Sequence, residues 1–139
     1  MSTFYVDASI PENVYRALAH VRADVLYPGE PGCPVTHRAA LDRDWLPMAG
    51  RQEWIVLMRD KHVRHGPGER NALLSHGVRA FVLTGAGNYT EWRTLHLLVR
   101  RWDEIEQIVA TVPGPFLYAV TQQGVQEIRL SAKGYRDHG

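Results

Sequence analysis

The chain has 139 residues, of which 45% are apolar and 22% are charged, and a formal net charge of +1. This length and apolar content are sufficient to bury one hydrophobic core, so we expect a single domain without disulfides or a structural metal. The single cysteine, Cys33, excludes an intramolecular disulfide and a cysteine-based zinc site. No apolar segment approaches the about 20 residues of a membrane span, and none near the N-terminus forms a signal peptide. We therefore expect a soluble, cytoplasmic protein without a membrane partner.

The first predicted elements are a strand, a helix and a second strand. Residues 4–7 form a short apolar run typical of a buried strand. Ser9 and Glu12 have the spacing of a capping box, which predicts a helix start at this point. The apolar positions of this helix share one face: Val14, Ala17, Leu18 and Val21. Residues 23–27 predict the second strand, and the Pro- and Gly-rich residues 28–34 predict a loop.

The middle of the chain contributes a helix, a strand and a shorter helix. Residues 36–51 predict the first helix, in which Pro47 causes a kink or lies in the first turn. Its apolar stripe contains Leu41, Trp45, Met48 and Ala49. Residues 54–58 are continuously apolar, as expected of a strand that is covered on both faces. A short helix over 69–76 ends at Gly77, because glycine favours the position just beyond a helix.

The last third of the chain predicts a strand, a long helix and a hairpin. Residues 80–84 form the strand, and residues 116–120 and 125–130 form the hairpin, which a polar tail, 131–139, follows. The long amphipathic helix between them has the stripe Trp92, Leu95, Val99, Trp102, Ile105 and Val109. Because Trp45, Trp92 and Trp102 fall on helical stripes, we expect them to pack in the core rather than stack on bases. Strands that alternate with helices predict an α/β fold, with a mainly parallel central sheet covered on both faces.

Two of the predicted strands are followed by an aspartate. Asp7 comes after the first strand, and Asp60 comes after the strand over 54–58. Both fit turn or helix-start positions, but parallel strands would bring them to the same edge of the sheet, where α/β proteins bind ligands. Two carboxylates at one edge repel each other, and a bound divalent cation removes that repulsion. Mg²⁺ needs only a couple of protein carboxylates, so the pattern favours magnesium-dependent chemistry on phosphates.

A third acidic cluster contains Asp42 and Asp44. Both aspartates border the apolar stripe of their predicted helix, so either one can reach the edge of the sheet. If Pro47 lies in the first turn, Asp44 becomes a natural N-cap, which is a purely structural role. We therefore expect Asp42 to be the third metal ligand, with Asp44 as the alternative.

The loop after Asp60 is basic. Its cationic or titratable side chains, together with that of the last strand residue, are Arg59, Lys61, His62, Arg64 and His65. They form either a solvated turn or a surface that binds the phosphates of a nucleic acid beside the metal ligands. His62 and His65 have no third histidine or cysteine that would indicate a zinc site.

Four segments together carry a family resemblance: 5–11, 41–46 with Ala49, 54–61 and 79–84. In this order and spacing they resemble a PIN-like domain, the fold of the VapC-type ribonuclease toxins of toxin–antitoxin operons. The resemblance implies a three-layer α/β/α domain over residues 1–130, followed by the polar tail over 131–139.

The resemblance also implies an activity. In that family, acidic residues bind Mg²⁺ or Mn²⁺ and activate water to cut RNA. Asp7 and Asp60 match the strand-end acids, and Asp42 matches the helical acid because it precedes the small residue Ala49 by seven positions. These three aspartates would be the catalytic and metal-binding residues, and Arg59, Lys61, His62 and Arg64 would bind the RNA. The implied partners are an RNA substrate and a cognate antitoxin protein, and the stripe of the long helix permits a homodimer.

Two departures from the family pattern leave alternatives open. Ala8 stands where related chains often carry another acid, and no acid follows the strand that ends at Thr84. A non-catalytic PIN-like binding module therefore remains an alternative. A phosphoacceptor receiver domain is the second one, but Ala8 and the closing hairpin argue against it.

Overall fold

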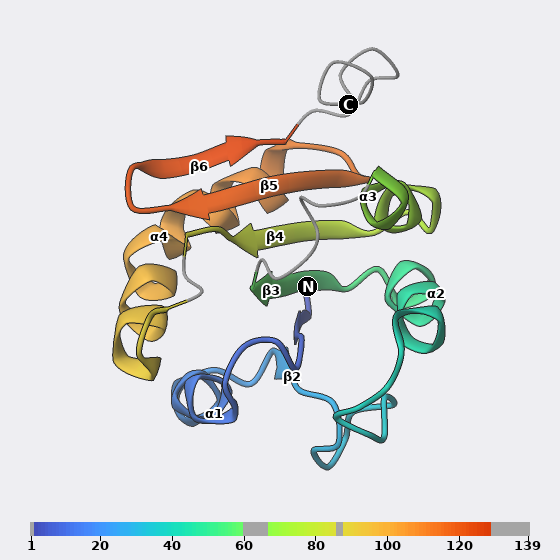
Figure 1. Ribbon diagram of the computed structural model, residues 1–139, viewed down its shortest axis with the longest axis horizontal. Helices are drawn as coiled ribbons and strands as arrows, with labels where there is room; N and C mark the ends of the chain where they lie inside the picture. The colour runs from blue at the N-terminus through green and yellow to red at the C-terminus, as the bar shows by residue number, and fades with distance from the viewer. Residues whose placement is uncertain (1, 60–66, 86–87, 129–139) are drawn as a thin grey trace.

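A six-stranded sheet forms the centre of the protein (Figure 1). The computed structural model describes residues 2–59, 67–85 and 88–128. Its strands are β1 (Phe4–Val6), β2 (Val25–Leu26), β3 (Ile55–Arg59), β4 (Arg79–Leu83), β5 (Phe116–Thr121) and β6 (Gly124–Glu127). They lie in the order β2-β1-β3-β4-β5-β6, and only β6 is antiparallel to its neighbour. The mainly parallel sheet and the C-terminal hairpin are thus confirmed.

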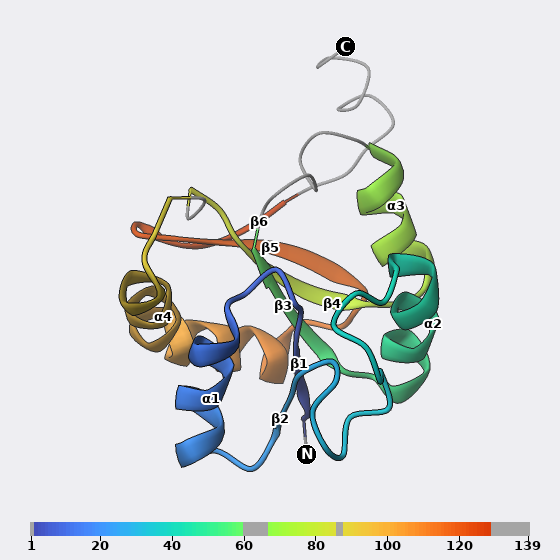
Figure 2. The ribbon, with the colours of Figure 1, turned by 60° about the horizontal axis from the view of Figure 1, so that its bottom comes forward.

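Two pairs of helices cover the two faces of this sheet (Figure 2). The helices are α1 (Glu12–Val21), α2 (Asp42–Gln52), α3 (Pro67–Ser75) and α4 (Glu91–Thr111). α1 and α4 cover one face, and α2 and α3 cover the other. The protein therefore has the three-layer α/β/α fold that the sequence predicts. None of the helices in the described ranges is both long and apolar enough to cross a membrane.

The sheet separates two hydrophobic cores because side chains alternate along each strand. Ile55 and Leu57 of β3 pack in the core that contains the apolar faces of α1 and α4. Val56 and Met58 pack in the other core, with residues of α2 and α3. All four side chains are buried, which explains the continuous apolar run of this strand.

The order of the strands defines where a ligand is expected to bind. β1 lies between β2 and β3, so the chain moves to one side of β1 through α1 and to its other side through α2. Such a reversal is a topological switch point. It creates a crevice at the carboxyl ends of the two strands concerned, here β1 and β3. Val6 pairs with Leu57, and the amide of Asp7 donates to the carbonyl oxygen of Leu57 at 2.8 Å. Asp7 therefore lies at this switch point.

The predicted capping box at the start of α1 is wrong. The helix begins at Glu12 after Pro11, and no side chain caps it. The Ser9 hydroxyl instead accepts a hydrogen bond from the amide of Arg59 at 2.9 Å, across the switch point. The Glu12 carboxylate binds Arg16 and Arg38. Both side chains of the expected box thus hold other segments of the chain.

The helix predicted over 36–51 begins later, at Asp42. Leu41 occupies the N-cap position, and Pro47 lies in the second turn, so Asp44 is not the N-cap. Asp44 is the third helical residue, and its carboxylate accepts the amide of Leu41 at 3.2 Å. This bond satisfies a donor just before the helix and explains why the helix starts here rather than at 36.

The predicted stripe of α4 is only partly correct. Trp102 and Ile105 are buried, but Trp92 is 73% exposed and Val99 is 59% exposed. The buried set also includes Thr94, Leu97 and Leu98. At helical spacing Trp92 and Val99 lie on the opposite side of α4 from this set. The expected core packing is therefore confirmed for Trp45 and Trp102 and wrong for Trp92.

Candidate metal centre

Asp7 is held in place by the turn that follows β1. Its carboxylate oxygen Oδ2 accepts the amide of Ser9 at 2.9 Å, and its carbonyl oxygen accepts the amide of Ile10 at 2.9 Å. The hydroxyl of Ser9 then accepts the amide of Arg59, the last residue of β3. The ends of β1 and β3 are thus joined beside Asp7, and Asp7 itself is only partly buried.

Asp42 projects from the first turn of α2 on the side that faces the sheet. It precedes the buried residues Trp45, Leu46 and Ala49 by three, four and seven positions, which places the four residues on one helical face. Asp44 lies on the other side, where it lines a surface cavity of about 240 Å³ with residues of the preceding loop. The structure therefore brings Asp42, and not Asp44, toward Asp7.

The charge of Asp7 acts on Asp42. Although Asp42 is exposed, desolvation of its carboxyl group by the surrounding protein and then the negative charge of Asp7 raise its pKa, and a hydrogen bond with Trp45 offsets this only in part. No ion pair with a basic side chain compensates Asp7 or Asp42 among the residues that the structure describes. Two like charges without a described basic partner lower the stability of the folded protein, and they favour a bound cation between them.

Tyr5 of β1 precedes Asp7 by two residues and is affected by the charges of both aspartates. Its side chain is buried, with the ring 5.1 Å from the ring of Trp54 and 5.2 Å from that of Trp45. Burial and then the charges of Asp7, Cys33 and Asp42 raise the pKa of its phenol far above the usual range. The hydroxyl makes no hydrogen bond with any described residue. A buried hydroxyl without a partner is unusual and marks a position where a further polar group is expected.

The remaining predicted site residues lie mostly outside the described ranges. This applies to Asp60, Lys61, His62 and Arg64, whereas Arg59 ends β3 and is partly exposed. Within 2–59, 67–85 and 88–128, no group of three or more His, Cys, Asp or Glu residues could hold a metal ion. The described site is thus a pair of carboxylates. Such a pair fits Mg²⁺ or Mn²⁺, since Mg²⁺ takes oxygen ligands, keeps several waters and is bound by one or two carboxylates.

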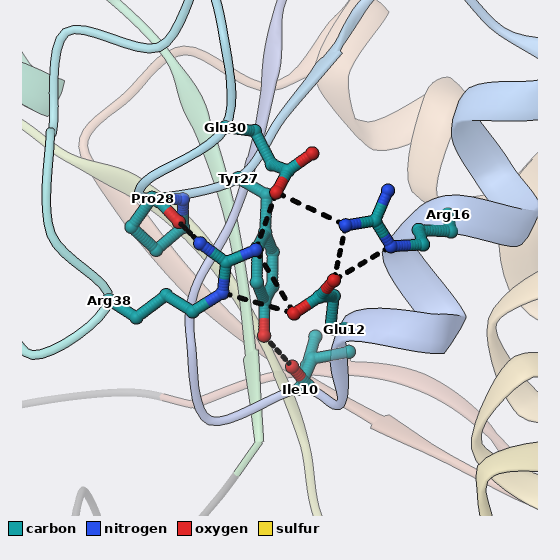
Figure 3. A network of polar contacts seen from close by, with 7 residues as sticks. All are labelled: Ile10, Glu12, Arg16, Tyr27, Pro28, Glu30 and Arg38. Carbon is teal, nitrogen blue, oxygen red and sulfur yellow. Dashed lines mark hydrogen bonds and ion pairs between the residues drawn. The ribbon is translucent and has the colours of Figure 1, made fainter.

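The sequence did not reveal a network of charges beside the site (Figure 3). Glu12 and Glu30 share the guanidinium groups of Arg16 and Arg38, and the Arg38 guanidinium also lies 5.2 Å from the centre of the Tyr27 ring. The spacing of Glu12 and Arg16 indicates a helical ion pair. Nothing in the loop sequence indicates that Arg38 folds back onto the start of α1.

One comparison with known proteins identifies the family. The model of the family described as a PIN-like domain matches residues 2–85, a segment that includes β1 to β4 and both described aspartates. No curated protein and no solved structure matches the chain. PIN-like domains are commonly nucleases, so the fold is of a nuclease type. With more than half of its length matched, the chain belongs to the PIN-like domain family.

Proposed function

We propose that the protein is an endoribonuclease that uses Mg²⁺ or Mn²⁺ to hydrolyse RNA phosphodiester bonds. The observation that carries the proposal is the pair Asp7 and Asp42, which lies at the switch point of a PIN-like fold with no basic partner among the described residues. Repulsion between the two carboxylates opposes folding, so the fold alone does not explain why both lie here. A cation site gives the pair a role.

We propose the following roles for the residues of the site. Asp7 and Asp42 would supply oxygen ligands, and the amide of Ser9 fixes one oxygen of Asp7. Asp60 follows Arg59 in the sequence and is proposed as the third ligand. When bound, the cation lowers the pKa of a coordinated water and neutralises charge on the phosphate. The buried Tyr5 hydroxyl, which has no hydrogen-bond partner among the described residues, would bind a water in this site.

The substrate would be held by the basic residues at the end of β3 and beyond it. We propose that Arg59, Lys61, His62 and Arg64 contact the RNA phosphates, since such contacts position the backbone without reading its sequence. Because the resemblance is to VapC-type toxins, we also propose a cytoplasmic toxin that a cognate antitoxin protein masks. The exposed Trp92 and Val99 on α4 are the surface proposed for a homodimer.

A specific observation favours one alternative, the non-catalytic PIN-like binding module. Thr84 follows β4 at the same edge of the sheet and carries no charge, and Ala8 provides no second carboxylate after β1. A module of this kind would bind RNA or protein through the same edge without cutting.

The decisive experiment measures cleavage of labelled RNA by the purified protein with Mg²⁺, with Mn²⁺ and with excess EDTA. Asp7→Asn is the test variant, and Asp24→Asn at the opposite edge of the sheet is its matched control. We expect metal-dependent cleavage by the parent and by Asp24→Asn, and little cleavage by Asp7→Asn. Undiminished cleavage in EDTA, or an Asp7→Asn protein as active as the parent, would refute the metal-dependent mechanism. RNA binding without cleavage by the parent would instead support the binding module.

A further inference from the structure

We propose that Arg38 is a positioning residue of the candidate metal centre, which sets the place of Asp42 relative to Asp7. The inference rests on the proposed function and goes beyond it, because Arg38 touches neither aspartate. It joins the segments that carry them.

Arg38 contacts both the start of α1 and the loop that follows β2 (Figure 3). Its Nη1 donates to the carbonyl oxygen of Pro28 at 3.0 Å, and its Nε donates to Glu12 at the start of α1 at 3.2 Å. Its Nη2 binds Glu30 in the loop. The guanidinium group also lies over the ring of Tyr27, which follows β2. One side chain thereby fastens the loop between β2 and α2 to the first turn of α1.

Tyr27 continues this connection toward Asp7. Its buried hydroxyl donates to the carbonyl oxygen of Ile10 at 2.6 Å. The amide of Ile10 in turn donates to the carbonyl oxygen of Asp7. The ring that Arg38 covers is therefore tied directly to the turn that presents Asp7.

The connection toward Asp42 is short. Arg38 precedes Asp42 by four residues. The amide of Ala40 donates to the carbonyl oxygen of His37 at 3.1 Å, and the amide of Leu41 donates to Asp44. These bonds leave little freedom between Arg38 and the first turn of α2. Displacing Arg38 should therefore shift Asp42 away from Asp7.

The loop also keeps room for this guanidinium group. Gly29 has a φ of +84°, a conformation that glycine adopts without strain. A Cβ atom at Gly29 would lie 2.3 Å from Nη1 of Arg38, so any other residue would displace the arginine. The planar fork of Arg38 serves several acceptors in fixed directions, which a lysine ammonium cannot do.

Arg22 provides a matched control. It binds Asp24 at 2.9 and 2.7 Å and Glu106 at 3.0 Å, and its guanidinium lies 4.8 Å from the ring centre of Trp102. It also lies 5.7 Å from the ring centre of Phe4, so it makes the same kinds of contact as Arg38, with two carboxylates and with aromatic rings. However, it does so at the amino edge of the sheet, far from the candidate metal centre.

The experiment compares Arg38→Met, Arg38→Lys and Arg22→Met with the parent. Mn²⁺ affinity is measured by electron paramagnetic resonance without RNA, and kcat and KM are measured with labelled RNA and Mn²⁺. We expect Arg38→Met to weaken Mn²⁺ binding about 10-fold, the scale on which residues that orient metal ligands act. We expect kcat to fall more than KM rises, and lysine not to restore either quantity. Arg22→Met should lose thermal stability like Arg38→Met but keep the Mn²⁺ affinity and kcat of the parent.

Other outcomes separate this inference from the proposed function. If the parent binds Mn²⁺ and cuts RNA but Arg38→Met does so equally well, the positioning role is refuted and the nuclease stands. Equal losses of Mn²⁺ affinity in Arg38→Met and Arg22→Met would also refute it, because the effect would then be general destabilisation. A parent that neither binds Mn²⁺ nor cuts RNA refutes both proposals. If Arg38→Met does not fold, Glu30→Ala removes one acceptor of Arg38 and is held to the same expectations.

Discussion

At the amino edge of the sheet, Asp24 and Glu106 share the guanidinium group of Arg22, whereas at the carboxyl edge Asp7 and Asp42 repel each other. The structure describes no basic partner for the second pair. The first arrangement stabilises the fold, and the second destabilises it. Proteins keep unfavourable charges of this kind where function needs them, so the difference between the edges supports the proposal that Asp7 and Asp42 bind a cation.

Two buried tyrosines repeat the same contrast. The hydroxyl of Tyr27 donates to the carbonyl oxygen of Ile10, but the hydroxyl of Tyr5 has no hydrogen-bond partner among the described residues. A buried polar group that is paired stabilises the protein, and one that is unpaired costs free energy. Tyr5 therefore belongs with Asp7 and Asp42 rather than with the structural network.

The largest expected effect is on catalysis. If it is absent, the contrast between the two edges of the sheet has no functional meaning. Asp42→Asn should lower the rate of RNA cleavage by about 100-fold or more, the scale on which loss of a single electrostatic group acts. Asp44→Asn should cleave like the parent, because an amide oxygen still accepts the amide of Leu41. Rates are measured on one labelled RNA under saturating Mg²⁺. An active Asp42→Asn together with an inactive Asp44→Asn would reverse the assignment of the ligand.

The next effect is on stability and concerns Tyr27, whose hydroxyl is hydrogen-bonded. Tyr27→Phe leaves the buried carbonyl oxygen of Ile10 without its donor and should lower the free energy of unfolding by about 1–3 kcal/mol. The measurement is urea denaturation followed by tryptophan fluorescence. A loss below about 0.5 kcal/mol would show that the connection between Tyr27 and the Asp7 turn is weak.

Asparagine substitutions at the two edges should change stability in opposite directions. Asp24→Asn breaks a partly exposed ion pair and should cost up to about 1 kcal/mol. Asp42→Asn should instead raise the melting temperature of the metal-free protein at neutral pH, because it removes repulsion from Asp7. A lower melting temperature for Asp42→Asn in EDTA at pH 7 would contradict the comparison.

The higher melting temperature expected for Asp42→Asn should depend on pH, because the pKa of Asp42 is raised. The folded protein retains this proton in a pH interval where the unfolded chain has released it, so stability falls as pH rises through the interval just above the ordinary Asp pKa. The advantage of Asp42→Asn should therefore disappear below that pKa, where the parent aspartate is protonated. The measurement is the difference in melting temperature between the parent and Asp42→Asn in EDTA across this pH range. Added Mg²⁺ should stabilise the parent but not Asp42→Asn.

The smallest expected effect concerns Tyr5. Tyr5→Phe removes a buried hydroxyl that has no described partner, so the free energy of unfolding should stay within about 0.5 kcal/mol of the parent or increase slightly. The same urea denaturation as for Tyr27→Phe gives the comparison directly. A loss as large as that of Tyr27→Phe would show that the Tyr5 hydroxyl has a structural partner.

Local patterns were sufficient to predict most of the fold. Alternating strands and helices predicted the parallel sheet, and the turn at Gly77 was recognised from its residue type. Patterns failed where a contact comes from far along the chain. Ser9 has the spacing of a helix cap, but its hydroxyl accepts a bond from Arg59, 50 residues away. Trp92 was misplaced because α4 carries apolar residues on two sides, and only packing decides which side faces the sheet.

The candidate site was predicted less completely than the fold. Strand ends are visible in the sequence, so Asp7 could be named as a ligand. The sequence favours Asp42 over Asp44 as the ligand, but the N-cap role that it predicts for Asp44 is wrong, because that role depends on where α2 starts. The contacts of Arg38 could not be predicted. They depend on how an irregular loop folds back onto α1, and such a loop has no periodic sequence pattern.

The bond between Ser9 and Arg59 has a consequence for synthesis of the protein. Because the turn that carries Asp7 is completed by a residue 50 positions later, the first strand cannot organise the candidate metal centre as it leaves the ribosome. Translation at about 5–20 residues per second delays β3 by seconds, and closure of so long a loop adds an entropic cost. Incomplete chains that end before β3 would therefore be inert, and the nascent protein would acquire its activity only after the central strands have met.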